Sequence, residues 1–434
     1  MSFDWVPFTD LLLSIVDNRG RTCPVGDSGM PLIATNCINP STLYPTYDTS
    51  RFVSKETYDT WFRGHPKAGD ILFVCKGSPG RTNWVPDPVD FCIAQDMVAV
   101  RADPEKIYPK YLFAALRSSA VQNQIDNMHV GTMIPHFKKG DFGKLNIPVP
   151  SDEDQLFIGD FYFTVSERIT LLRETNTLLE QIAQTIFKSW FVDFDPVRAK
   201  QEGRMPEGMD EETAALFPDS FEESELGMVP RGWQISGLGE CTTYLNRGIS
   251  PKYLETGGIL VINQKCVRDF AVDLAKARRH DPSQRKIDGR ELQVGDVLVN
   301  STGVGTLGRV AQIVTLDQPA IVDSHVTVVR SSNDVGWNYL GQFLMRKQPE
   351  IADLGEGTTG QTELSRGKLS NLKMVVPCKE VLVCFDSITK PLRFRIAENF
   401  DQAQILADLR DTLLPRLISG KLRLPEVNLE NVLS

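Results

Sequence analysis

The sequence is poor in the residues that build most metal and redox sites. Its 434 residues include only five histidines, and none of its eight cysteines forms a C-x-x-C pair. Structural zinc sites need closely spaced Cys and His ligands, so we expect no metal site in this chain. The cysteines are interpreted as buried thiols in their reduced form.

Apolar runs long enough to cross a membrane are also missing. No stretch approaches the roughly 20 apolar residues of a membrane-spanning helix, and the N-terminus lacks the basic and then apolar pattern of a secretion signal. We therefore expect a cytoplasmic protein without membrane contact. The hydrophobic content of 41% is ordinary for a chain with well-packed cores.

Catalytic motifs are absent or do not fit their required context. There is no P-loop, and there is no Asn-Pro-Pro-aromatic element of the kind that amino-methyltransferases use to hold a base. Residues 303–308 match G-x-G-x-x-G, but the residues that follow alternate like a strand, so we interpret the match as a hairpin turn. Residues 323–325 (Asp-Ser-His) have the types of a hydrolase triad, but in a strand Ser324 would point away from its neighbours. We expect no active site and no cofactor.

A long helix with a coiled-coil seam is the clearest feature that the sequence contains. Between residues 158 and 190, apolar side chains recur at steps of three and four, which is the spacing of a helix that packs along a partner helix. The helix is expected to end near Phe191, because Pro196 cannot continue a helix and disfavours helical backbone at Asp195.

This helix occurs twice in the chain. Arg168-Ile169 matches Arg395-Ile396 at an offset of 227 positions, and the segment 144–150 matches 371–377 at the same offset. Pro391 lies inside the second copy, so we expect that helix to kink there or to begin only near Leu392. The predicted seam consists of Ile169, Leu172, Leu179 and Ile186 in the first copy and of Ile396, Leu406 and Leu413 in the second.

The repeat also extends upstream into the globular parts. Asp96 matches Asp323 at an offset of 227, and Asn18 matches Asn246 at an offset of 228. The chain is therefore interpreted as a tandem duplication of a globular domain followed by a helix. We predict an α+β fold, with two similar mixed α/β domains separated by two long helices that pack as an antiparallel coiled coil and create a pseudo-twofold axis. The predicted boundaries are 1–150, 151–196, 197–230, 231–377, 378–425 and a tail of 426–434.

Charge is unevenly distributed along the chain. The formal net charge is −9, and residues 200–227 hold nine acidic and only two basic residues, so this connector is predicted to be acidic. A negative chain does not bind nucleic acid with its whole surface, but local basic faces are compatible with DNA binding. Any single basic residue is by default part of a solvated surface, whereas their concentration in loops of both copies favours DNA contacts. The candidate DNA-binding residues are Lys76, Arg81, Lys138, Lys139, Lys265, Arg268, Arg278, Arg279, Arg285, Lys286 and Arg309.

Three segments resemble the specificity subunit of type I restriction–modification systems. Residues 178–200 (LLEQIAQTIFKSWFVDFDPVRAK) resemble the central conserved region of that family. Residues 224–233 (SELGMVPRGW) resemble the usual entry to its second recognition domain, and residues 409–422 (LRDTLLPRLISGKL) resemble its closing segment. The resemblance extends over the whole chain, including the duplication.

The resemblance implies a division of labour along the chain. Residues 1–150 and 231–377 would be target recognition domains, each reading one half of a bipartite, asymmetric site in double-stranded DNA. The two helices would set the gap between the half-sites and dock two methyltransferase (modification) subunits, which restriction subunits can join. The chain itself would not be catalytic. The alternatives are a single-chain restriction–modification enzyme, whose motifs are missing here, and a scaffold that binds no DNA.

Overall fold

The computed structural model describes residues 4–18, 22–47, 50–128, 130–131, 133–357 and 362–422. The chain divides into two compact units: unit 1 comprises residues 1–174 and 400–434, and unit 2 comprises residues 175–399. The predicted tail, 426–434, lies outside the described residues. Within the described ranges, no helix is both long and apolar enough to cross a membrane.

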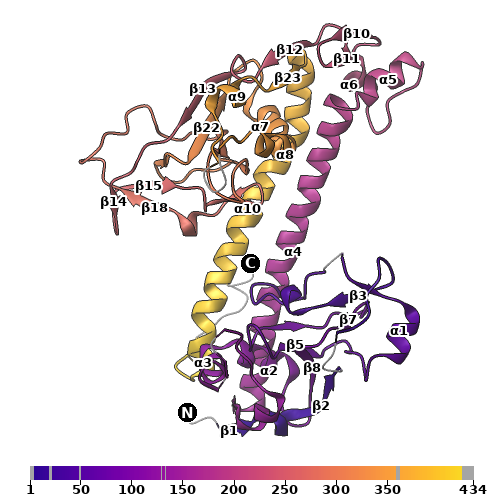
Figure 1. Cartoon of the computed structure of the whole chain (residues 1–434), viewed down its shortest axis with the longest axis vertical. Helices are drawn as coiled ribbons and strands as arrows, with labels where there is room; N and C mark the ends of the chain where they lie inside the picture. Colours follow the sequence, from indigo (N-terminus) through magenta and orange to yellow (C-terminus); the bar gives the residue numbers. More distant parts are fainter. Residues whose placement is uncertain are drawn as a thin grey trace. The chain divides into compact units, whose positions relative to one another are not determined.

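Unit 1 is built on a four-stranded antiparallel sheet in the order β2-β8-β5-β6 (Figure 1). Successive side chains of a strand point to opposite faces. Phe73 of β5 accordingly packs in the core that contains helix α2, whereas Leu72 packs with Ile33 of the small sheet β4-β3-β7. The elements are β1 (Asp4–Pro7), η1 (Phe8–Leu11), β2 (Leu12–Asp17), β3 (Met30–Ile33), η2 (Thr35–Cys37), β4 (Phe52–Val53), α1 (Lys55–Thr60), β5 (Ile71–Val74), β6 (Thr82–Trp84), β7 (Cys92–Ile93), β8 (Met97–Ala102), α2 (Pro109–Arg117), α3 (Ser119–Met128), η3 (Lys139–Lys144) and β9 (Asn146–Val149).

Unit 2 repeats this arrangement. Its four-stranded sheet has the order β13-β22-β19-β20, and Leu298 of β19 faces the core of a second sheet, β14-β18-β15-β21, in which β15 and β21 are parallel. Val299 faces the opposite core, with helix α7. The elements are β12 (Gln234–Gly237), β13 (Thr242–Arg247), β14 (Tyr253–Leu254), β15 (Ile259–Ile262), β16 (Val267–Arg268), β17 (Ala271–Val272), η4 (Leu274–Lys276), β18 (Arg278–His280), β19 (Val297–Asn300), β20 (Val310–Gln312), β21 (Ala320–Val322), β22 (Val326–Ser331), α7 (Trp337–Arg346), α8 (Gln348–Asp353), α9 (Arg366–Ser370) and β23 (Lys373–Val376).

One buried ion pair occurs in both copies and shows how they correspond. The carboxylate of Asp70 accepts a hydrogen bond from Nε of Arg101 at 2.7 Å, and the carboxylate of Asp296 accepts one from Nε of Arg330 at the same distance. Both carboxylates are almost fully buried. Burying a carboxylate without a partner costs free energy, and in each copy the bidentate hydrogen bonds from the arginine offset that cost. In the alignment of the two copies, β5 therefore corresponds to β19 and β8 corresponds to β22.

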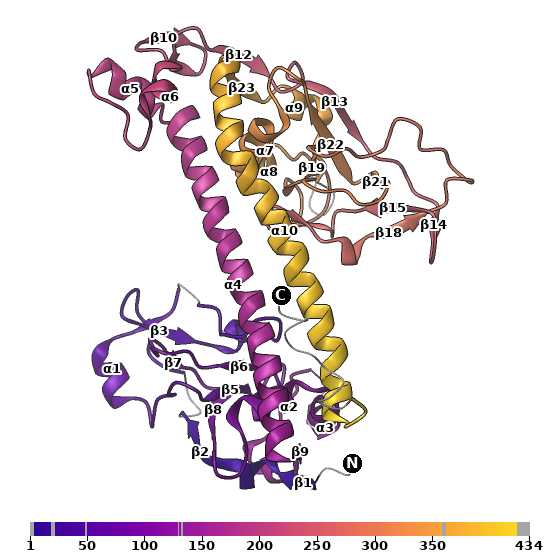
Figure 2. The ribbon, with the colours of Figure 1, turned by 180° about the vertical axis from the view of Figure 1, so that it is seen from behind.

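Two helices of 40 residues each complete the units: α4 (Asp152–Phe191) and α10 (Lys379–Ile418). In unit 2 they pack antiparallel, because Asn176 contacts Asn399 whereas Glu180, further along α4, contacts the earlier residue Arg393 of α10. The two helices lie side by side there in both views (Figure 1 and Figure 2). In unit 1, Arg410 of α10 bonds Ser166 of α4. Among the predicted seam residues, Ile169, Leu172 and Leu406 are buried, and Leu179, Ile186, Ile396 and Leu413 are partly buried.

The prediction that Pro391 would delay or kink the second helix is wrong about where the helix begins. α10 starts at Lys379 and continues through Pro391, which is exposed. The turns before the proline are held by buried Val381 and Phe385 in the core of unit 2. Burying two such side chains stabilises the helix by roughly 3–6 kcal/mol, which offsets the roughly 3 kcal/mol cost of an interior proline.

The exit from the first helix also differs in part from expectation. α4 ends at Phe191 as predicted, but Pro196 does not prevent a helix at Asp195: it occupies the first turn of a new helix, α5 (Asp195–Gln201). A proline is tolerated there because the first N–H groups of a helix have no intrahelical partner. The acidic connector continues through α6 (Glu211–Ala215) and the hairpin of β10 (Phe221–Ser224) and β11 (Gly227–Pro230).

Candidate nucleic-acid interface

Several loops converge at one end of each four-stranded sheet, and we call this region the loop end. In unit 2, Ser301 N–H donates to His325 O at 2.8 Å, and Leu364 N–H donates to Ser301 O at 2.8 Å. In unit 1, Cys75 N–H donates to Asp96 O, and Phe137 N–H donates to Cys75 O, also at 2.8 Å. The loop ends are therefore built alike. They comprise residues 17–18, 34–36, 75–81, 94–96 and 133–139 in unit 1 and residues 246–248, 263–265, 301–309, 323–325 and 362–366 in unit 2.

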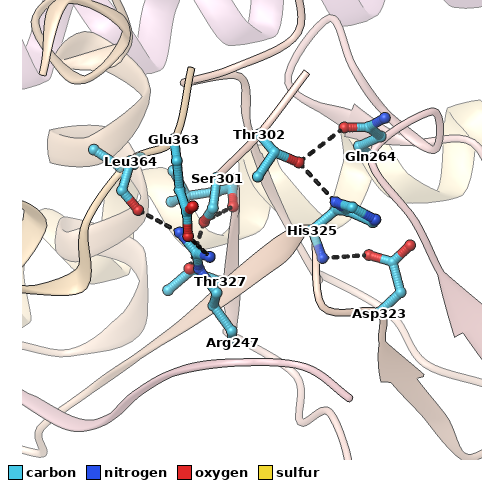
Figure 3. Close-up of polar contacts among 10 residues, drawn as sticks. Arg247, Gln264, Ser301, Thr302, Asp323, His325, Thr327, Glu363 and Leu364 are labelled. Atoms are coloured by element: carbon cyan, nitrogen blue, oxygen red, sulfur yellow. Dashed lines mark hydrogen bonds and ion pairs between the residues drawn. The ribbon is translucent and has the colours of Figure 1, made fainter. Parts of the chain in front are cut away.

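Polar side chains of five types gather at the loop end of unit 2 (Figure 3). Thr302 Oγ1 lies 2.8 Å from Nδ1 of His325 and 3.4 Å from Oε1 of Gln264. The Arg247 guanidinium forms an ion pair with Glu363 and donates to Leu364 O at 2.6 Å. Hydroxyl, amide, carboxylate and guanidinium groups are among those that read base edges in the major groove.

Residues 323–325 form a turn between β21 and β22, not the strand that we had assumed for them. The Asp323 carboxylate accepts from the backbone N–H of His325 at 2.9 Å, while the His325 ring contacts Thr302, so a hydrolase triad is not assembled. Burial raises the pKa of Asp323, although the hydrogen bond from His325 N–H and the nearby imidazole act in the opposite direction. Asp323 therefore anchors the turn.

The structure also corrects the alignment of the repeat at this turn. Asp96 corresponds to His325 and not to Asp323. The carbonyl of each accepts a hydrogen bond from the backbone N–H of the residue that follows β5 in unit 1 or β19 in unit 2. Asp323 corresponds instead to Ala94, since Asp323 N–H bonds Ile262 O as Ala94 N–H bonds Ile33 O. The sequence match at a constant offset missed this shift because the two copies differ in loop length.

The loop 303–308 is a hairpin turn, as predicted. It joins β19 to the antiparallel strand β20, so the helix that a dinucleotide site requires does not follow. The backbone of Gly303 and Gly308 lies at φ of 107° and 82°, in a region that favours glycine. A Cβ at Gly308 would approach Cα of Ala352 to 2.6 Å, which holds the turn against α8.

The loop end of unit 1 collects four of the predicted DNA-binding residues. Lys76 and Lys138 are exposed, and Lys139 forms an ion pair with Asp17. Burial lowers the pKa of Lys139. Arg81 is less available, because its Nη2 donates to Thr35 O at 3.0 Å.

Two of the candidates in unit 2 lie at its loop end, and five lie elsewhere. Lys265 is exposed beside Gln264, and Arg309 donates to Gly305 O at 2.9 Å within the hairpin turn. The other five lie on β16, on β18 and in the segment after it. The Arg278 guanidinium carbon lies 3.3 Å from the ring centre of Tyr253, Arg279 bonds Gln318, Arg285 bonds Ser250 O, Arg268 pairs with Asp269, and Lys286 is exposed.

Charge alone overlooked several loop-end residues. Gln264, Thr302 and His325 carry no permanent charge, and Glu363 is acidic. A better signal was available in the duplication, because the bridge between Thr302 and Glu363 is equivalent to the bridge between Lys76 and His136. Aligning the copies by their strands instead of by one offset would have identified these positions. No group of three or more His, Cys, Asp or Glu residues is placed to hold a metal ion within the described ranges.

Comparisons with known proteins agree on one family. The family model "Type I restriction modification DNA specificity domain" matches residues 27–181. The HindI specificity subunit of Haemophilus influenzae is 24% identical over 412 residues, which cover 82% of this chain and 87% of the relative. The MjaIX specificity subunit of Methanocaldococcus jannaschii is 25% identical over 333 residues, covering 74% and 71%.

A solved structure shares the fold. The S subunit of a type I restriction–modification system from M. genitalium superposes with a TM-score of 0.59 at 16% identity, covering 96% of each chain. The duplicated α/β domains and the long helices agree with the fold of that structure. The chain is similar in sequence to type I restriction–modification specificity subunits over most of its length.

Proposed function

We propose that this chain is the DNA sequence-recognition subunit of a type I restriction–modification complex. Each loop end reads one half of a bipartite, asymmetric site. The observation that supports this function best is a repeated backbone that carries different side chains in the two units. The equivalent pairs are Asp17 and Arg247, Thr35 and Gln264, Lys76 and Thr302, Asp96 and His325, and His136 and Glu363.

The difference at these positions is what two unlike half-sites require. Base edges are distinguished by their pattern of donors and acceptors, so a lysine and a threonine at equivalent positions select different bases. The framework beneath them, which includes the pairs Asp70–Arg101 and Asp296–Arg330, is the same in both units. We accordingly propose 1–150 and 231–377 as the two target recognition domains and 197–230 as their acidic connector.

Apolar side chains on the outside of the helices support a docking role for segments 151–196 and 378–425. In unit 2, Leu178 and Val383 are 59% and 60% exposed, and Ile182 and Phe394 are also exposed. In unit 1, Ile405 is 68% exposed. Such side chains are usually covered by a partner when they gather on one element. The proposed partners are two methyltransferase subunits, which restriction subunits join, in the cytoplasm where the DNA lies.

Domain exchange tests independent reading. Residues 1–150 are replaced by the matching domain of a relative that methylates a different site, and methylated adenines are mapped in the genome of a host that also makes the modification subunits. We expect one half of the methylated site to change and the other half to stay the same. The reciprocal exchange of 231–377 is the matched control and should change the other half. A change in both halves after a single exchange would contradict the proposal.

The rival functions give different results in simpler assays. A scaffold without a DNA role would not shift a DNA duplex in a gel when the modification subunits are present, whereas the proposed subunit would. A single-chain restriction–modification enzyme would methylate DNA without any partner. The similarity of the chain to type I specificity subunits supports the sequence-recognition role over both.

A further inference from the structure

Each loop end contains an ion pair that joins the end of its first long strand to the segment before its last strand. In unit 1, Asp17 at the end of β2 pairs with Lys139 at the start of η3. In unit 2, Arg247 at the end of β13 pairs with Glu363, shortly before α9. The strand positions are equivalent and differ in charge, whereas the loop partners come from different positions, because Glu363 is equivalent to His136 and not to Lys139.

The strand register establishes that Asp17 and Arg247 are equivalent. Asp17 is opposite Val98 of β8, three residues before Arg101, and Arg247 is opposite Thr327 of β22, three residues before Arg330. Arg101 and Arg330 form the repeated buried pairs and therefore fix the alignment. The match of Asn18 with Asn246 at offset 228 is wrong by two residues, and it concealed the difference in charge.

Both pairs remain open to solvent. The side chains of Arg247 and Glu363 are 28% and 59% exposed, and those of Lys139 and Asp17 are 43% and 32% exposed. Arg247 is also held by Leu364 O at 2.6 Å, and Nη1 of Arg290 donates to the Arg247 carbonyl at 2.9 Å. The cation of unit 2 is thus fixed in the strand, while the carboxylate of Glu363 is the more exposed partner.

A carboxylate on a surface that faces DNA acts differently from a cation. It neutralises the adjacent cation and is itself repelled by phosphates, so it weakens the sequence-independent attraction that supplies nonspecific binding. It is also an acceptor without a donor, and an exposed carboxylate matches the exocyclic amino group of a base such as cytosine. The carboxylate therefore lowers the affinity for DNA of incorrect sequence more than it raises the affinity for the correct site.

We propose that Asp17 and Glu363 are specificity-determining residues, each of which suppresses binding to incorrect DNA and accepts a hydrogen bond from a base amino group in its own half-site. This inference rests on the proposed function. The reversed polarity places the acceptor on the strand in unit 1 and on the loop in unit 2, so the two units present it at different positions.

The test uses the full chain together with its modification subunits and compares wild type with Glu363→Gln. Glutamine keeps the shape of glutamate but adds a donor and removes the charge. Binding is measured on a duplex carrying the mapped methylation site and on an unrelated duplex over a series of salt concentrations. Methylated adenines are mapped in the host genome.

For Glu363→Gln we expect tighter binding to the unrelated duplex and a plot of log affinity against log salt that is steeper by about one, because one cation becomes free to contact phosphate. Methylation of sites with one wrong base in the half read by unit 2 should rise about fivefold, which is the lower end of the usual effect of one mismatch. The other half should remain unchanged. Asp17→Asn is the matched control and should relax only the half read by unit 1.

Three outcomes separate the possibilities. If the wild-type complex does not methylate a defined site, the proposed function fails. If it does, but both variants retain wild-type salt dependence and site choice, this inference alone is wrong.

The double variant Arg247→Glu/Glu363→Arg restores an ion pair with the polarity of unit 1, so it guards against loss of folding. It should melt near the wild-type temperature and change the preference in the unit 2 half, and an unchanged preference would overturn the inference.

Discussion

Single residues in this chain either preserve the repeat or distinguish its two copies. Asp70 and Asp296 are the same in both copies because each is buried and must keep its arginine. Removing one partner of such a pair usually costs about 3–5 kcal/mol, so neither member can change alone. Loop-end residues such as Lys76 and Thr302 have no equivalent constraint, since they lie at the surface, and they are therefore the positions at which the copies have diverged.

One half-buried histidine should make the stability of unit 1 depend on pH. The ring of His65 stacks on Tyr58 at 3.7 Å, its Nε2 donates to Tyr58 O, and its buried Nδ1 has no hydrogen-bond partner. Burial lowers the pKa of His65 from its ordinary value of 6.5, because a second proton would lie on Nδ1 without an acceptor. The folded state therefore binds fewer protons than the unfolded state.

It follows that the contribution of His65 to stability is fully present above pH 6.5 and is lost as the pH falls toward its lowered pKa. We expect the melting temperature of the wild-type chain to fall between about pH 7.5 and about pH 5.5, and the fall to be smaller for His65→Phe, which keeps the stacking but cannot be protonated. An identical fall in both proteins would assign the pH dependence to other groups.

At the scale of elements, regular patterns were predictable and local exceptions were not. The steps of three and four in the sequence predicted both long helices, and the repeat predicted the second copy of the sheet. The start of α10 was not predictable from Pro391, because the packing of Val381 and Phe385 that offsets the proline is a tertiary effect. The loop ends were predictable only in part, for a similar reason: their residues come from five separate segments, and only the fold brings them together.

The helix pair contains a contact between two asparagines where a coiled-coil seam usually has apolar side chains. Nδ2 of Asn399 donates to Oδ1 of Asn176 at 2.9 Å, and Nδ2 of Asn176 donates to Ile396 O at 3.0 Å. At the repeat offset of 227, the equivalent positions are Leu172 and Ala403, which are buried in the core of unit 1. A buried asparagine pair costs stability but disfavours other registers of the two helices.

A double-mutant cycle tests this contact. Asn399→Leu alone should lower the free energy of unfolding by about 1–3 kcal/mol, because it leaves Oδ1 of Asn176 without its donor in a partly buried seam. Asn176→Ala/Asn399→Leu gives unit 2 the apolar pair of unit 1 and should recover most of that loss. Urea unfolding of the full chain measures both. Additive effects of the two substitutions would show that the asparagines do not interact.

At the scale of the whole molecule, the duplication separates what is shared from what is variable. The shared parts are the four-stranded sheets, the buried aspartate–arginine pairs and the long helices, and the variable parts are the loop ends. Under the proposed function, a chain organised in this way would acquire a new half-site by changing one loop end while the proposed docking helices stay the same. The proposed spacer role adds a second variable, the length of α4, which is independent of both loop ends.

Spacer length should therefore set the gap between half-sites. Four residues inserted after Glu174, where α4 passes from unit 1 to unit 2, add about 6 Å of helix, which is close to two base pairs at about 3.4 Å each. They also advance the helix by about 400°, only about 40° past a full turn, so the seam keeps nearly the same direction. We expect the variant to methylate the same two half-sites with a longer gap between them.

A two-residue insertion at the same place is the matched control. It turns the rest of α4 by about 200°, which directs seam residues such as Leu179 away from α10 and should abolish methylation. Genome-wide mapping of methylated adenines distinguishes these outcomes, since it reports both half-sites and their separation. If the four-residue variant is folded and active but its gap is unchanged, α4 does not act as the ruler, because an element that sets a distance cannot be lengthened without changing that distance.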